Sequence, residues 1–341
     1  MFRSNLQYIG KVYILKGGPG NGKSTLMKKI GKHFEEKDFD VEYIHCSADE
    51  DSLDGVIIRQ LSAAVVDGTA PHVIEPSCPG CIEEYVNIGA AWDTVKLKAD
   101  QAKIKQLLQE NSECYPKAYE KFAEAFQIHD EWEKIYITNM NFEKADELAD
   151  SVVEEIINGK RFHKESKVYH RFFGGTTCNG PVNFVENIIE PISKKYYIKG
   201  RPGSGKSTLL KKLVVKARQN GINAEVYHCS FDPNSLDMVL LPELDCVIFD
   251  STAPHEYSPN SNSDTLVDMY EELIVPGTDE DNEKVLDDIK KRYQIKIKDG
   301  VSYLKKAKEI HDEIEGCYIK ATDFSVVERI TNTLIEKIEN Q

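Results

Sequence analysis

Short apolar runs alternate with longer amphipathic segments in two parts of the chain, and this alternation predicts strands and helices in turn. The runs at residues 11–15, 41–46 and 63–66 have the length of buried strands, and an amphipathic stretch beginning at Leu26 follows the first of them. A succession of strand, helix and strand predicts an α/β fold with a parallel sheet and right-handed crossovers. The same order of apolar runs returns at residues 195–198, 224–229 and 246–249.

The segments after each third strand are strongly helical in pattern. Residues 96–112, 117–138 and 142–158 are predicted to form three helices, with breaks near Pro116 and at residues 139–141. Charged residues dominate between the apolar positions, as they do on the solvated helices of a hairpin or coiled-coil arm. Earlier in each half, Ser52 and Ser235 are predicted N-caps of a short helix.

The two halves are copies of one another at a constant offset of 183 residues. Residues 16–25 match residues 199–208 at eight of ten positions. His-Cys-Ser-x-Asp-x-x-Ser-Leu-Asp follows the second predicted strand in both halves, and Asp-x-Thr-Ala-Pro-His follows the third. Ile-His-Asp-Glu recurs in the helical segments at an offset of 182. Duplication of one domain is therefore predicted, with domains at residues 1–163 and 164–341 and helical arms at about 82–160 and 280–340.

A glycine, four residues and then Gly-Lys-Ser stand between the first strand and its helix in each half. This pattern is typical of a phosphate-binding loop, because glycines allow the backbone N–H groups to converge on an anion at a helix N-terminus. The lysine supplies a point charge for the β- and γ-phosphates, and the serine hydroxyl is a ligand for Mg²⁺. The predicted nucleotide-binding residues are Gly17, Gly20, Asn21, Gly22, Lys23, Ser24 and Thr25 in the first loop, and Gly200, Gly203, Ser204, Gly205, Lys206, Ser207 and Thr208 in the second.

Asp67 and Asp250 each end an apolar strand, which is where nucleotide-binding folds place a carboxylate that holds Mg²⁺ directly or through water. An aspartate at a strand end can also cap the turn that follows. The predicted metal ligands are Ser24, Asp67, Ser207 and Asp250.

Hydrolysis also needs a group that positions or deprotonates the attacking water, and many ATPases carry a glutamate directly after that aspartate. Gly68 and Ser251 occupy those positions here. The base must then come from elsewhere, or turnover is slow. Besides the loop lysines, the candidate catalytic residues are Asp49, Asp232, His72 and His255, for which turn, cap or packing roles are the alternative.

Two arginines are weaker candidates for the sites, and two helix histidines are not. Arg201, inside the second loop, and Arg171 are candidate arginine fingers. His129 and His311 stand among acidic residues at i+1 and i+2, which do not share a helix face, so a metal site within one helix is not predicted.

Composition narrows the function classes. The 341-residue chain has a net charge of −14 and no long Lys/Arg tract, which argues against an extended nucleic-acid groove. No apolar run approaches the roughly 20 residues that span a bilayer, and no secretory signal is evident, so a cytoplasmic protein without a membrane partner is expected. Its eight cysteines are expected to be reduced; Cys78-Pro-Gly-Cys81 has the spacing of half a zinc site or a redox pair, with a plain loop as the alternative.

The paired loops, the His-Cys-Ser segments and the Ala-Pro-His turns make the chain resemble the P-loop NTPase superfamily. More narrowly, it resembles a bacterial family of tandem P-loop ATPase-like proteins, to which no established process is attached. The likeness covers both domain cores and not the helical arms. It implies three-layer α/β domains that bind nucleotide and Mg²⁺ at Lys23, Ser24 and Asp67, and again at Lys206, Ser207 and Asp250.

The expected function is therefore that of an ATP- and Mg²⁺-binding tandem P-loop ATPase with slow hydrolysis, whose helical arms transmit nucleotide state to each other or to a protein partner. No guanine-reading Asn/Thr-Lys-x-Asp stretch is found, which favours ATP over GTP. One alternative is a small-molecule kinase that uses Asp49 or Asp232 as base, and another is a nucleotide-dependent interaction module without enzymatic activity. The pattern leaves the oligomeric state open.

Overall fold

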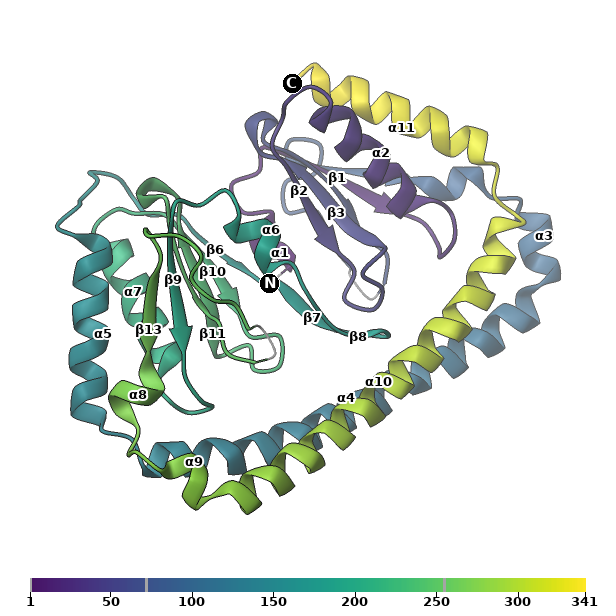
Figure 1. Cartoon of the computed structure of the whole chain (residues 1–341). Coiled ribbons are helices and arrows are strands. Elements are labelled where there is room, and N and C mark those ends of the chain that lie inside the picture. Colours follow the sequence, from purple (N-terminus) through teal and green to yellow (C-terminus); the bar gives the residue numbers. More distant parts are fainter. Residues whose placement is uncertain (1, 71–72, 254–255) are drawn as a thin grey trace. The chain divides into compact units, whose positions relative to one another are not determined.

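The computed structural model describes residues 2–70, 73–253 and 256–341, which form two compact units of mixed α/β structure (Figure 1). Unit 1 comprises Glu120–Gly175 and Pro181–Asp299 together with the N-terminal residues through Asn5. Unit 2 comprises Leu6–Tyr119, Thr176–Gly180 and Gly300–Gln341. Each unit thus combines the loop-bearing core of one sequence repeat with a helical segment of the other.

The sheet of unit 2 has five strands in the order β2-β3-β4-β1-β5. Strands β1 (Lys11–Lys16), β4 (Ala63–Asp67) and β5 (Glu83–Asn87) are parallel, with β1 in the middle, whereas β2 (Val41–His45) and β3 (Leu53–Ile58) pair antiparallel. The short helices η1 (Arg59–Leu61), η2 (Ile88–Ala91) and α3 (Thr94–Ala99) connect these elements to the next. The sheet is therefore mixed rather than wholly parallel.

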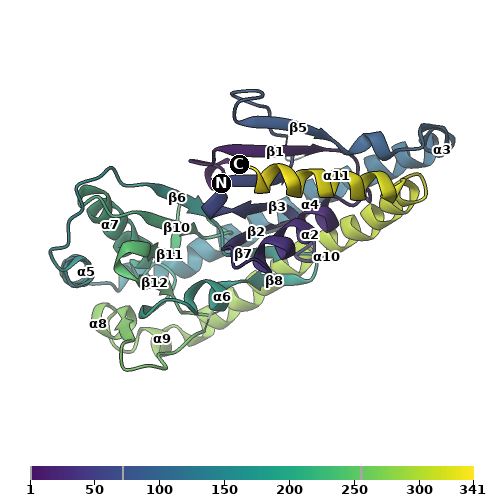
Figure 2. The ribbon, with the colours of Figure 1, turned by 90° about the horizontal axis from the view of Figure 1, so that it is seen from above.

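Two helices from distant parts of the sequence cover the core of unit 2. Helix α2 (Lys23–Glu35) buries Leu26, Met27, Ile30 and Phe34, a helical spacing, and α11 (Phe324–Glu339) lies beside it (Figure 2). Side chains of both helices belong to one apolar cluster with β1, β3 and β4. The last helix of the second repeat therefore completes the core of the first.

Unit 1 repeats this plan with a six-stranded sheet in the order β13-β9-β12-β11-β10-β6. Strands β9 (Lys194–Lys199), β12 (Cys246–Asp250) and β13 (Thr265–Asp268) are parallel, β10 (Ala224–His228) and β11 (Leu236–Leu241) pair antiparallel, and β6 (Val168–Arg171) is parallel to β10. Helices α7 (Lys206–Gln219) and α5 (Phe142–Ile157) share its larger apolar cluster. The remaining short elements are α1 (Phe2–Asn5), β7 (Gly174–Thr177), β8 (Gly180–Asn183), α6 (Val185–Ile189), η3 (Pro242–Leu244), α8 (Met269–Leu273) and α9 (Thr278–Asp281).

Both long helices contribute to both units. Helix α4 (Gln101–Thr138) pairs its first part with the last part of α10 (Glu283–Ile319) in unit 2, through Leu107, Ala307 and Ile310. In unit 1 its last part packs against the start of α10 and α8. The predicted break at Pro116 is wrong, because α4 continues through it; the exposed proline gives up one helical hydrogen bond without ending the helix.

The prediction of short helices capped by Ser52 and Ser235 is also wrong. Leu53–Ile58 and Leu236–Leu241 are strands, each hydrogen-bonded between two neighbours. Both runs are apolar and rich in β-branched or other large aliphatic residues, and they are nearly fully buried, which favours a central strand. The six strands that the sequence does predict are confirmed to within two residues at each end.

Candidate functional site

The first glycine-rich loop lies between the buried strand β1 and the N-terminus of α2. Gly20 and Gly22 have φ angles of 63° and 84°, which residues with a Cβ rarely adopt. A Cβ on Gly17 would lie 2.3 Å from the Asn21 side chain, which is itself fully buried. The loop backbone is therefore held in one conformation at the start of a helix, where the backbone dipoles favour an anion.

The second loop, between β9 and α7, has the same construction. Gly203 and Gly205 have φ angles of 76° and 88°, and a Cβ on Gly200 would lie 2.5 Å from Ser204 Oγ. Ser204 is 1% exposed and takes the place of Asn21. The repeated loop sequence thus gives two loops of the same backbone shape.

The loop lysines point at the strand-end aspartates. Lys23 Nζ lies 3.5 Å from Asp67 Oδ2 and donates to the carbonyl of Gly18 at 2.6 Å. Lys206 Nζ lies 3.4 Å from Asp250 Oδ2 and donates to the carbonyl of Arg201 at 3.0 Å. All four side chains are less than a fifth exposed, so these pairs are sheltered from bulk water. Sequence reasoning grouped each lysine with its aspartate, and the structure brings them together.

The aspartates serve two purposes at once. Asp67 Oδ1 accepts a hydrogen bond from the N–H of Thr69 at 2.8 Å, and Asp250 Oδ1 accepts from Thr252 at 2.9 Å. The threonine hydroxyls in turn accept from the N–H groups of Gly17 and Gly200. One carboxylate oxygen therefore caps the turn after the strand, which is the alternative role weighed for these residues, while the other faces the loop lysine.

The loop serines are positioned by the strands that the sequence pattern had suggested were helices. Ser24 Oγ accepts a hydrogen bond from the N–H of Leu53 at 3.0 Å, and Ser207 Oγ accepts from Leu236 at the same distance. These leucines begin β3 and β11. Each hydroxyl retains a second lone pair, so it can still be a ligand for a hard cation.

A further carboxylate beside each loop was not singled out from the sequence. Asp54 is 8% exposed, and Asp237 stands at the equivalent position on β11. Burial, and next the charge of Asp250, raise the pKa of Asp237 to about 7. Burial, and next the charge of Asp237, raise the pKa of Cys229 to about 12, which makes this cysteine an inert thiol. The recurrence of Ser-Leu-Asp in both repeats was the signal that could have identified these carboxylates.

Asp49 and Asp232 make turn contacts in the structure. Asp49 accepts from the N–H of Asp51 and from the hydroxyl of Ser52, and Asp232 accepts from Asn234 and Ser235 in the same way. Burial acts to raise the pKa of Asp232, but the hydrogen bonds from Ser235 and Asn234 outweigh it and hold the pKa below its usual value. A carboxylate stabilised in its charged form is a weak general base.

The candidate arginines, and the histidines of the repeated His-Cys-Ser segments, are held by other contacts. His72 and His255 lie outside the described residues. His45 and His228 pair through Nδ1 with backbone oxygens of Glu50 and Pro233. Arg201 is ion-paired with Asp279 at 2.8 Å and stacks on Tyr270, and Arg171 Nε lies 3.4 Å from Glu225.

One glutamate of the helical segments lies against each glycine-rich loop. The sequence pattern did not identify these two glutamates. Gly20 N donates to Glu315 Oε1 at 3.2 Å, and a Cβ on Gly20 would lie 2.7 Å from the backbone oxygen of Glu315. A Cβ on Gly203 would lie 2.9 Å from the backbone oxygen of Glu133. The two glutamates are 182 residues apart and follow the repeated Ile-His-Asp-Glu, which was the available signal.

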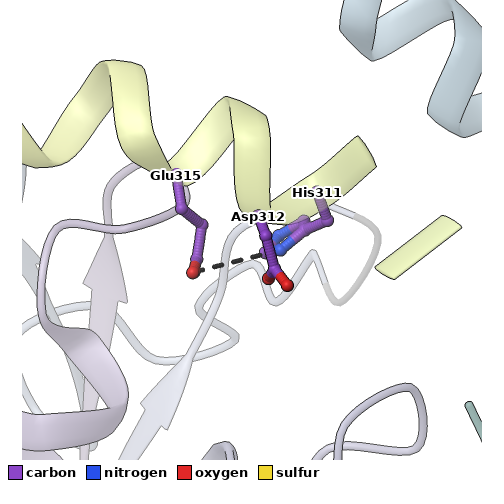
Figure 3. Close-up of side chains that lie close together, drawn as sticks. All are labelled: His311, Asp312 and Glu315. Carbon is purple, nitrogen blue, oxygen red and sulfur yellow. Dashed lines mark ion pairs between the residues drawn. The ribbon is translucent and has the colours of Figure 1, made fainter. Parts of the chain in front are cut away.

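Glu315 lies with His311 and Asp312 on α10, with possible ligand atoms within 4.8 Å of one another (Figure 3). Their spacing of one and four residues differs from the i+1 and i+2 neighbours considered from the sequence. Asp312 is paired with Lys308, and Glu315 accepts from the loop amide. These partly exposed carboxylates already have partners, so the group by itself indicates no metal site.

Comparison of the chain with protein-family models, curated proteins and solved structures found no match. In the part of the chain that the structure describes, no helix combines the length and the apolarity needed to cross a bilayer.

Proposed function

We propose that the chain is an ATP- and Mg²⁺-binding tandem P-loop ATPase, with one nucleotide site at each glycine-rich loop and slow hydrolysis coupled to conformational change. The observation that carries this proposal is the arrangement of Lys23 with Asp67 and of Lys206 with Asp250. In both units the lysine at the start of the helix has its Nζ close to Oδ2 of the strand-end aspartate, at 3.5 Å in unit 2 and 3.4 Å in unit 1. Each pair lies beside loop N–H groups that can bind anions.

The residues fit the polyphosphate of a nucleotide and its cation. The loop N–H groups and the lysine are donors for phosphate oxygens. Ser24 and Asp67, or Ser207 and Asp250, offer the hard oxygen ligands that Mg²⁺ prefers, and bound Mg²⁺ would neutralise charge on the phosphates. Arriving phosphates would take the lysine from the loop carbonyl and the aspartate, which frees the aspartate oxygen for the cation.

Coupling to the helical segments is supported by where the loops make contact. Gly18 and Gly20 face Tyr318 and Glu315 of α10, and Gly203 faces Glu133 and Ile137 of α4. A change of loop conformation on phosphate binding would therefore be felt first by these helices, which is the basis for proposing that they carry the nucleotide state to a partner protein.

Calorimetric titration with ATP and with GTP in the presence of Mg²⁺ tests the proposal. We expect two equivalents of ATP to bind, and the substitutions Lys23→Ala and Lys206→Ala each to remove one. The matched controls Lys32→Ala and Lys211→Ala change exposed lysines on the same two helices and should leave both equivalents. Absence of ATP binding would refute the proposal, and binding without phosphate release would reduce it to a nucleotide-dependent interaction module.

A further inference from the structure

Many ATPases carry a catalytic glutamate directly after the strand-end aspartate, and in both units this position has no room for a glutamate side chain. A Cβ on Gly68 would lie 2.3 Å from Ile14 Cγ2, so no side chain fits there without moving the core. Ser251 is fully buried and donates its hydroxyl proton to the carbonyl of Ile198 at 3.0 Å. A base for hydrolysis must therefore reach the phosphates from another element.

In unit 2 the carboxylate that contacts the loop is Glu315. Its Oε1 accepts the N–H of Gly20, and the backbone of α10 is packed so closely that only glycine fits at that loop position. Gly20 is the fourth residue of the loop, in the row of N–H groups that faces the phosphates of a bound nucleotide. Glu315 thus occupies a donor that phosphate oxygens would use.

In unit 1 the equivalent residue is Glu133. Its backbone meets Gly203, the fourth residue of the second loop, as Glu315 meets Gly20. Burial, and next the charges of Asp130 and Asp232, raise the pKa of Glu133, whereas the charge of Lys206 lowers it. Glu133 is therefore close enough to the loop lysine to feel its charge.

A histidine stands four residues before each glutamate. His311 Nδ1 lies 3.9 Å from Glu315 Oε1 (Figure 3), and His129 Nδ1 lies 3.7 Å from Glu133 Oε1. The neighbouring side chains differ between the repeats, since Phe126 and Trp132 correspond to Lys308 and Ile314. The histidine, the glutamate and the contact with the loop recur although these two neighbours differ, which fits a role in the site.

We propose that Glu315 and Glu133 are the water-activating carboxylates of the two phosphate sites, each supplied by the helical segment of the opposite sequence repeat. The inference rests on the proposed ATPase function. In the step, a water oxygen forms a bond to the γ-phosphorus while the bond from that phosphorus to the β–γ bridging oxygen breaks. The water proton passes to the glutamate and then to solvent, and ADP and inorganic phosphate leave.

The contact with the loop amide links the proposed base to bound nucleotide. Glu315 Oε1 accepts the N–H of Gly20. Phosphate oxygens that take over this N–H would release the carboxylate from the loop, which leaves it available to accept the proton of the attacking water.

The test measures ATP binding and phosphate release separately for each site. In a Lys206→Ala background, which isolates the first site, Glu315→Gln should retain ATP binding and lower phosphate release about 100-fold or more. In a Lys23→Ala background, Glu133→Gln should have the same effect on the second site. Glu313→Gln and Glu120→Gln, exposed positions on the same two helices, are the matched controls and should change neither quantity.

A structural role for the glutamates would change ATP affinity and thermal stability together with turnover, whereas the proposed role leaves the first two within error. The pH profile gives a second readout, because the low-pH limb of phosphate release should flatten in the glutamine variants. Unchanged release in these variants would overturn the inference, as would ATP binding without any release by the unaltered chain. Absence of ATP binding would instead refute the proposed function itself.

Discussion

The surroundings of Asp237 disfavour its charged form and thereby destabilise unit 1 at neutral and alkaline pH. Replacing Asp237 with asparagine should therefore make unit 1 more stable at these pH values. The pKa of Asp237, about 7 in the folded chain, compares with an ordinary value of 3.8. Because the folded chain holds this proton more tightly than the unfolded chain, the contribution of Asp237 to the free energy of unfolding is highest below about pH 4 and falls as the pH rises to 7.

The size of the effect follows from the two pKa values. Each tenfold difference in proton affinity corresponds to about 1.4 kcal/mol, which sets a ceiling of about 4 kcal/mol above pH 7. The side chain retains some contact with solvent, so we expect about half of this ceiling. In Asp237→Asn the loss is absent, and the stability difference between variant and parent should grow from its value at pH 4 to about 2 kcal/mol more at pH 8.

Urea unfolding followed by tryptophan fluorescence measures this difference. The chain has two tryptophans, Trp92 in unit 2 and Trp132 in unit 1, so a Trp92→Phe background reports on unit 1 alone. Asp287→Asn, an exposed position on α10 in the same unit, is the control and should show no trend with pH. A stability difference for Asp237→Asn that stays constant or shrinks between pH 4 and pH 8 would refute the reasoning.

Two further predictions concern backbone geometry. Gly316 lies within α10 with open space at its Cβ position, so Gly316→Ala should stabilise unit 2 by about 0.5–1 kcal/mol in urea unfolding. Gly20→Ala should destabilise unit 2 and abolish ATP binding at the first site, because the φ of 63° at Gly20 and its contact with Glu315 exclude a side chain. Equal effects of the two substitutions would contradict this prediction. Pro116→Ala should stabilise α4 by up to about 3 kcal/mol without changing the helical signal in circular dichroism, and a gain in helix content would show that the helix is interrupted in the parent chain.

Local pattern was sufficient for the loops and for the six predicted strands. The run before Gly17 and the run that ends at Asp67 are apolar, short and bounded by turn residues, which is sufficient to place both strands. Their neighbours in the sheet do not follow from strand–helix–strand order, because β1 lies beside β4 and β5 and not beside β2. The prediction of a helix at Leu53–Ile58 was wrong because Ser52 resembles an N-cap residue. The strand is instead specified by its burial between β2 and β4, a tertiary effect that local sequence does not reveal.

The glutamates at the loops were not predictable for a different reason. Glu315 is separated from Gly20 by 295 residues, and within α10 it is one of many acidic residues on a charged helix. Only the packing of one repeat's helix on the other repeat's loop distinguishes it. The sequence repeat indicated two equal domains in tandem, while the exchange of helical segments between the compact units is visible only in the folded chain.

The pairing of α11 with α2 has a consequence for the order in which the chain can fold during synthesis. The apolar face of α2, made early, is covered by Val327, Leu334 and Ile338, which are synthesised after the strands of both repeats. Vectorial folding from the N-terminus therefore cannot finish the first loop's unit before the second loop's strands have been made. A ribosome stalled after α5 would hold a chain that contains a complete glycine-rich loop yet lacks the helices that hold it in place.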